Sequence, residues 1–124
     1  MNCLIIDESP TRRKFLQSIL KPHITELWEA VNPREIQARL NSSNPDWVVF
    51  NLETHGLDGL KLVQNLKEQH PDNRTIVLSA YDDPDLKSEA LKAGAFGFVL
   101  LDNLLEVEVL VSCLSFKSSK RSYA

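Results

Sequence analysis

Short apolar runs alternate along the chain with longer segments in which apolar residues recur at helical spacing. Five runs have the length and the residue types of strands, and they lie at residues 3–6, 24–30, 47–50, 75–78 and 98–101. The run at 24–30 alternates only weakly between apolar and polar residues. The other segments repeat apolar residues every three or four positions, which predicts helices over residues 10–20, 33–40, 60–69, 84–93 and 104–116.

Residues typical of helix ends support these helices. Ser9 is a candidate N-cap with Pro10 at the first helical position, and Asn32–Pro33 repeats the same signal. The acids of Asp82–Asp85 suit the positive end of the fourth helix dipole, and Gly94 suits a left-handed C-cap. Strand and helix therefore alternate five times, which favours an α/β fold with a parallel sheet covered by helices on both faces.

The length of 124 residues fits a single domain, which we place at residues 1–117 with a polar tail at 118–124. A net charge of −3 gives no general attraction to nucleic acid or to an anionic membrane, so we expect neither as a direct partner. No apolar run reaches the length of a membrane span and no basic flank precedes the first run, so we expect a cytoplasmic protein. Cys3 and Cys113 lack neighbouring His or Cys residues, and we expect both to be reduced and packed as small hydrophobes.

Polar residues stand where three of the predicted strands end. Asp7–Glu8 follows the first run, Asn51 follows the third and Ser79 follows the fourth, whereas Leu101 ends the fifth. The carboxyl ends of parallel strands meet at one edge of a sheet, where ligands and reactive groups gather. We therefore expect any chemistry of this chain to be concentrated at that edge, around Asn51.

Three segments carry these residues, and they read LIIDESPTRRKFL, DWVVFNLETHGLDGLKLV and IVLSAYDDPDLKSEALKAGAFGFVLLD. In order and spacing they resemble the response-regulator receiver domain of two-component signalling and phosphorelays, a CheY-like family, over residues 2–117. The pattern is most similar to receivers of the NarL/LuxR class. The resemblance implies a flavodoxin-like (βα)5 fold, a doubly wound parallel sheet with strand order 2-1-3-4-5.

The resemblance also implies a reaction that this chain lacks the residues to perform. In the family a carboxylate at the end of the third strand attacks a phosphoryl group beside Mg²⁺, but Asn51 stands there, and an amide is a poor nucleophile. We expect Asn51 not to be phosphorylated. Leu101 replaces the family's lysine and offers a phosphoryl group no charge. Ser79 keeps the family hydroxyl, and Phe98 keeps the aromatic ring of the switch position without a hydroxyl.

Candidate metal ligands are the carboxylates of Asp7 and Glu8 and the backbone carbonyl of Glu53. Because position 51 adds no carboxylate, we expect weak Mg²⁺ binding at best, and no other cofactor. His55, in the loop after Asn51, is interpreted as an exposed histidine without a partner.

These substitutions predict a pseudo-receiver that is not an enzyme and acts by protein–protein interaction without phosphorylation. Its partner is expected on the face formed by helix 84–93, strand 98–101 and helix 104–116. The last helix is apolar nearly all round, which favours contact with a partner protein or a homodimer. We also predict that Asn51→Asp alone would not restore efficient phosphorylation, because Leu101 would still replace the lysine.

Two alternatives stay open at this point. One is a conventional Mg²⁺-dependent receiver that is phosphorylated at Asp46 or Asp58, although neither residue stands at the strand end that in-line transfer needs. The other is the regulatory part of a NarL/LuxR-type transcription regulator, in which a helix-turn-helix domain follows the receiver.

Overall fold

The computed structural model describes residues 1–54 and 58–121, in which strands and helices alternate as the sequence predicts. The strands are β1 (Asn2–Ile6), β2 (Glu26–Ala30), β3 (Trp47–Asn51), β4 (Arg74–Ser79) and β5 (Gly97–Leu100). The helices are α1 (Pro10–Leu20), α2 (Pro33–Ser42), α3 (Gly59–Gln69), α4 (Pro84–Ala93) and α5 (Leu105–Arg121), and a short 3₁₀ helix, η1 (Leu101–Asn103), joins β5 to α5.

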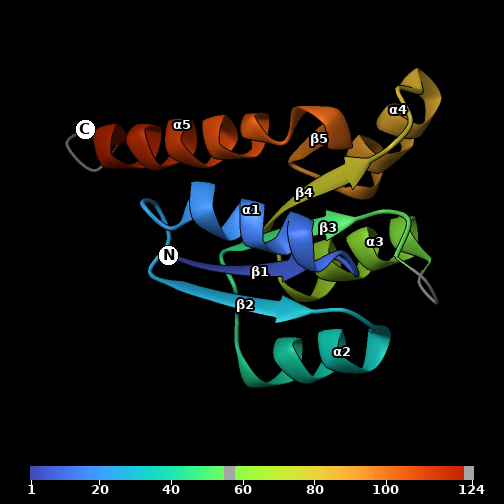
Figure 1. Ribbon diagram of the computed structural model, residues 1–124, viewed down its shortest axis with the longest axis horizontal. Helices are drawn as coiled ribbons and strands as arrows, with labels where there is room; N and C mark the ends of the chain where they lie inside the picture. The colour runs from blue at the N-terminus through green and yellow to red at the C-terminus, as the bar shows by residue number, and fades with distance from the viewer. Residues whose placement is uncertain (55–57, 122–124) are drawn as a thin grey trace.

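The five strands form one parallel sheet in the order β2-β1-β3-β4-β5, which confirms the predicted flavodoxin-like topology. The register pairs Ile6 of β1 with Phe50 of β3, and Asn51 of β3 with Leu78 of β4. The strand arrows point toward the same edge of the sheet in Figure 1. The loops that follow β1, β3 and β4 therefore leave the sheet side by side.

Helices cover both faces of the sheet, and each face has its own apolar core. In β1, Cys3 and Ile5 point into the core beneath α1 and α5, while Leu4 and Ile6 point into the core beneath α2, α3 and α4. Successive residues of a strand face opposite sides of the sheet, and all four side chains are buried because helices cover both sides. This two-sided burial explains why the strands read as continuous apolar runs.

Three predicted helix caps are confirmed, whereas α2 and α5 both end later than predicted. The Ser9 and Asn32 side chains accept hydrogen bonds from the backbone N–H groups three residues later, and Gly94 has a φ of 118° at the end of α4. Helix α5 continues to Arg121, beyond the predicted end at Phe116. The segment 117–121 contains neither Gly nor Pro, so nothing in it stops a helix.

The two cysteines have different environments. Cys3 is buried, and burial raises the pKa of its thiol to about 12, opposed by a smaller effect of the hydrogen bond with the Val49 backbone. Cys113 is exposed on α5, so the prediction that it packs as a small hydrophobe was wrong. Within the described ranges, no helix is both long and apolar enough to cross a membrane.

Candidate functional site

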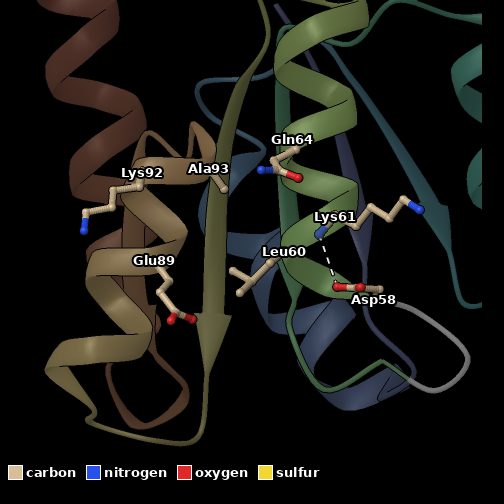
Figure 2. Close-up of a pocket in the computed structure, with 7 residues that line it drawn as sticks. All are labelled: Asp58, Leu60, Lys61, Gln64, Glu89, Lys92 and Ala93. Atoms are coloured by element: carbon tan, nitrogen blue, oxygen red, sulfur yellow. Dashed lines mark hydrogen bonds between the residues drawn. The ribbon is translucent and has the colours of Figure 1, made fainter.

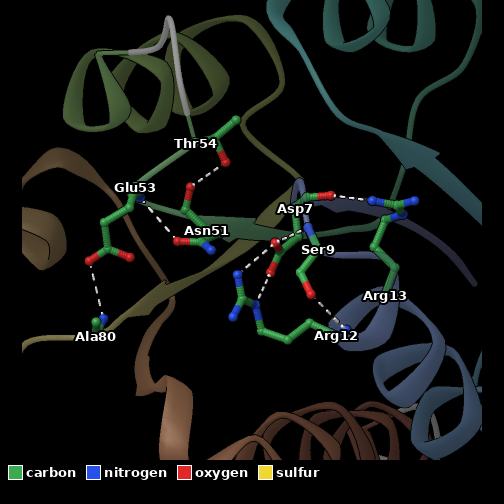
Figure 3. A network of polar contacts seen from close by, with 8 residues as sticks. All are labelled: Asp7, Ser9, Arg12, Arg13, Asn51, Glu53, Thr54 and Ala80. Atoms are coloured by element: carbon green, nitrogen blue, oxygen red, sulfur yellow. Dashed lines mark hydrogen bonds and ion pairs between the residues drawn. The ribbon is translucent and has the colours of Figure 1, made fainter.

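The fold brings the polar residues at the strand ends together, as Figure 3 shows for Asp7 and Asn51. Asp7 follows β1, Asn51 ends β3 and Ser79 ends β4, and at most 5% of each residue is exposed. Buried polar groups need partners. The contacts that satisfy these three residues define what the site can do.

Asp7 is held by the first turn of α1. Its Oδ2 accepts from Arg12 Nε at 2.7 Å, and its Oδ1 accepts from Arg12 Nη2 at 3.2 Å and from the Ser9 N–H at 2.9 Å. Arg13 Nη1 donates to the backbone carbonyl of Asp7 at 2.7 Å (Figure 3). Glu8, the second acid of the pair, lies at an exposed position. The buried carboxylate is therefore neutralised by an arginine of its own chain.

Charge around Arg12 favours its cationic form. Hydrogen bonding to Asp7 raises the pKa of the Arg12 guanidinium above its ordinary value, and partial burial opposes that shift. The charges of Asp7 and Glu53 raise the pKa further. Arg12 therefore interacts with acids from two different strand ends, although sequence reasoning did not include it among the site residues.

Asn51 has the geometry of a turn-forming residue. Its Oδ1 accepts from the Glu53 N–H at 3.0 Å, and its backbone carbonyl accepts from the Thr54 N–H at 3.1 Å and from Thr54 Oγ1 at 2.7 Å. Asn side chains commonly hold turns by bonding a backbone N–H two residues on. The side-chain oxygen at the phosphoacceptor position is therefore a hydrogen-bond acceptor within the chain's own loop.

The Glu53 carboxylate extends across to the end of β4, where Figure 3 shows it beside Ala80. Its Oε1 accepts from the Ala80 N–H at 3.1 Å and, more weakly, from Ser79 Oγ at 3.5 Å. Ser79 Oγ also accepts from the Tyr81 N–H at 3.0 Å. The prediction assigned Glu53 a role through its backbone carbonyl only, so the position of its side chain is a new element of the site.

Leu101 and Phe98 both pack against apolar residues. Leu101 lies in η1, half-buried against the core beneath α1 and α5. It also lines a groove of about 420 Å³ with Arg12 and Phe15 of α1 and with Leu104 and Leu105 at the start of α5. Phe98 is half-buried on the opposite face of the sheet. Leu101 thus adds no charge at the end of β5.

The two alternative phosphoacceptors lie apart from this cluster. Asp46 precedes β3, at its amino end, where its Oδ2 accepts from the Asn2 N–H at 2.9 Å. Asp58 caps α3 through the Lys61 N–H at 3.2 Å. It lines a surface groove of about 500 Å³ between α3 and α4, shown in Figure 2, which includes none of the strand-end residues. His55 lies outside the described residues.

Comparison with known protein families matches residues 3–103 to the response regulator receiver domain. The chain belongs to this family. Receiver domains are signalling domains of two-component systems, and the family assignment predicted from the three sequence segments is confirmed.

Individual relatives agree with the family match. The receiver is 31% identical over 113 residues to the nitrate/nitrite response regulator protein NarL of Escherichia coli, covering 90% of this chain and 51% of that protein. The chain therefore spans about half the length of this curated relative. A response regulator from Thermotoga maritima has a TM-score of 0.77 with 29% identity, over 89% of this chain and 95% of that one.

A receiver domain from Colwellia psychrerythraea has a TM-score of 0.85 at 21% identity, over 93% of this chain and 98% of that one. At this identity the likeness shows the fold alone. It agrees with the strand order of this chain.

Proposed function

We propose that this receiver domain works without phosphorylation, as a protein-interaction domain in two-component signalling. The observation that carries the proposal is the amide of Asn51 at the position from which the family's carboxylate attacks, with its Oδ1 accepting from the Glu53 N–H at 3.0 Å. An amide nitrogen is delocalised into its carbonyl, and the amide oxygen has no full negative charge. Attack on a phosphoryl group and formation of an acyl phosphate are therefore unfavourable.

Leu101, which follows β5, also argues against phosphorylation. A developing negative charge on a phosphoryl group needs a fixed cation nearby, and the half-buried Leu101 side chain packs against the core. The domain therefore lacks both the nucleophile and the cation that the resemblance assigns to these positions. It is proposed to be a signalling module rather than an enzyme, and to be cytoplasmic.

The test is to incubate the protein with acetyl phosphate and Mg²⁺ and to follow phosphoryl incorporation by intact mass. We expect no incorporation, because no carboxylate stands at the end of β3. Beryllofluoride with Mg²⁺ should likewise leave the amide NMR signals of Asn51, Ser79 and Phe98 in place.

Asp46→Asn and Asp58→Asn are the matched variants for the alternative phosphoacceptors. Incorporation into the unaltered chain would overturn the proposal. Its loss in one of these two variants would identify the unusual acceptor.

The proposed partner surface is the face of α4, β5 and α5. Val107 and Val111 of α5 are buried, whereas Leu105 is 58% exposed and Val109 is 54% exposed one turn apart. The apolar character of this helix therefore exceeds what its buried face uses. We propose that a partner protein, or a second copy of this chain, covers Leu105 and Val109.

Sedimentation velocity over a range of protein concentrations tests the homodimer form of this proposal. We expect concentration-dependent association of the unaltered chain, which Leu105→Arg combined with Val109→Arg should abolish by placing charges in the contact. Gln37→Arg on α2, on the other face of the sheet, is the matched control and should leave association unchanged. Monomers at every concentration would contradict the homodimer.

A second candidate function is favoured by the match to NarL, of which the chain covers 51%. In this alternative, the domain is the regulatory part of a longer transcription regulator. Any contact with DNA would then be made by residues outside this domain, consistent with its net charge of −3.

A further inference from the structure

The cluster of polar residues at the strand ends includes a cation of the chain itself. Arg12 binds both carboxylate oxygens of Asp7, with Nε–Oδ2 at 2.7 Å and Nη2–Oδ1 at 3.2 Å. Planar two-point pairing of this kind is the strongest arrangement that a guanidinium makes with a carboxylate. Asp7 is 0% exposed, so its charge has no access to solvent and depends on this pair.

Mg²⁺ does not fit this arrangement. The ion binds carboxylate oxygens at about 2.0–2.1 Å and demands near-octahedral geometry, but both oxygens of Asp7 already face the Arg12 guanidinium (Figure 3). Two cations at one buried carboxylate would also repel each other. Across residues 1–54 and 58–121, no three His, Cys, Asp or Glu side chains gather to hold a metal.

The carboxylate of Glu53, a residue at an exposed position, lies at the same strand ends. Glu53 Oε1 accepts from the Ala80 N–H at 3.1 Å and from Ser79 Oγ at 3.5 Å. The resemblance assigns the Ser79 hydroxyl to the binding of the phosphoryl group, and the Ala80 N–H is the backbone donor next to it. Glu53 is near enough to Arg12 for its charge to contribute to the raised pKa of the guanidinium.

We propose that side chains of this domain occupy the positions of both ligands at the strand ends: Arg12 takes the place of the metal ion, and the Glu53 carboxylate takes the place of the phosphoryl anion. The inference rests on the proposed function, because both side chains occupy positions that a phosphorylated receiver must keep open. The replacement of the metal ion by Arg12 also accounts for the uncharged residues at positions 51 and 101. Arg12 neutralises Asp7 without a metal, so neither the third carboxylate nor the lysine is needed for charge balance.

The inference predicts that the removal of Arg12 frees the Asp7 carboxylate to bind Mg²⁺. In Arg12→Ala, we expect the thermal midpoint to fall and saturating Mg²⁺ to raise it by several degrees. Amide signals of Asp7 and Asn51 should shift saturably with Mg²⁺ in this variant. The unaltered chain should show neither response.

Arg13→Ala is the matched control because it also removes one arginine charge, at the neighbouring position. Arg13 donates to the backbone carbonyl of Asp7 and to Glu29, so its loss leaves both Asp7 carboxylate oxygens on Arg12. We expect no Mg²⁺ response in this variant. Arg12→Ala combined with Asp7→Asn should lose the response of the single variant, which would locate the ion at Asp7.

Glu53→Ala tests the anion position with inorganic phosphate as the probe. We expect phosphate to shift the amide signals of Ser79 and Ala80 in Glu53→Ala and not in the unaltered chain. Glu68→Ala, an exposed acid on α3, is the control and should behave like the unaltered chain.

The titrations of the unaltered chain decide the inference even if a variant fails to fold. Saturable Mg²⁺ or phosphate shifts at these residues in the unaltered chain would overturn it. That result would leave phosphorylation-independent action standing, because the proposed function is contradicted by labelling with acetyl phosphate and not by the binding of Mg²⁺ or inorganic phosphate.

Discussion

Asn51→Asp alone is expected to leave the domain essentially unlabelled by acetyl phosphate. The new carboxylate would face an Asp7 already paired with Arg12, so Mg²⁺ would still lack its site. Leu101 would still provide no cation for the transferring oxygens. The loss of one such electrostatic contact typically slows a reaction by roughly 10²–10³-fold. The single change therefore provides a nucleophile at a site that does not support phosphoryl transfer.

Labelling should return only when Arg12, Glu53 and Leu101 are changed as well. We expect Arg12→Ala, Asn51→Asp, Glu53→Ala and Leu101→Lys together to incorporate phosphate at least roughly 10²-fold faster than Asn51→Asp alone, measured as initial rates by intact mass. The control is the same set of changes with Asn51 kept, which should remain unlabelled. Robust labelling of Asn51→Asp by itself would show that none of these three residues limits the reaction.

Trp47→Ala is expected to lower the free energy of unfolding by about 3–5 kcal/mol, the range typical of a fully buried large aromatic. Trp47 begins β3 and is 0% exposed, with its ring edge-on to Phe96 at a centroid distance of 5.5 Å. Alanine would leave a cavity between the central strand and the α1 and α5 side of the core, because packed cores collapse only partly. Urea denaturation measures the change.

Trp47→Phe should cost much less, roughly 1 kcal/mol, for a reason specific to this site. The indole Nε1 is buried without a hydrogen-bond partner, so phenylalanine removes an unsatisfied donor together with part of the packed ring. Trp28→Ala on β2, an edge strand, is the comparison, and it should cost less than Trp47→Ala because Trp28 is only half-buried. A Phe variant as unstable as the Ala variant would indicate that Nε1 has a partner, such as a buried water.

The fold was predictable because its determinants are local and repeated. The strands β1, β3 and β4 are buried on both faces, so their sequences are continuous apolar runs, and their helices begin at recognisable caps such as Ser9. The least regular run, 24–30, became an edge strand, Glu26–Ala30, where only Ala30 is fully buried and the pattern is weaker. The end of α5 was missed because no residue before Arg121 marks a stop.

The candidate site was predictable only as far as backbone topology determines it. Parallel strands bring Asp7, Asn51 and Ser79 to one edge in any fold of this order. The roles of Arg12 and Glu53 depend on the direction of long side chains, which residue spacing does not specify. One signal was present: with Ser9 as N-cap, Arg12 is the third helical residue, and side chains in a helix tilt toward its N-terminus and hence toward Asp7.

The contrast between the two cysteines makes this chain ready for thiol-specific labelling. Cys3 is buried with a thiol pKa of about 12, whereas Cys113 is exposed on α5. Because maleimides react with accessible thiolates, a fluorophore would attach at Cys113 alone while the protein is folded. The dye would then lie one turn beyond Val109. A partner that binds this helix would change the emission of the dye, and no cysteine would need to be introduced.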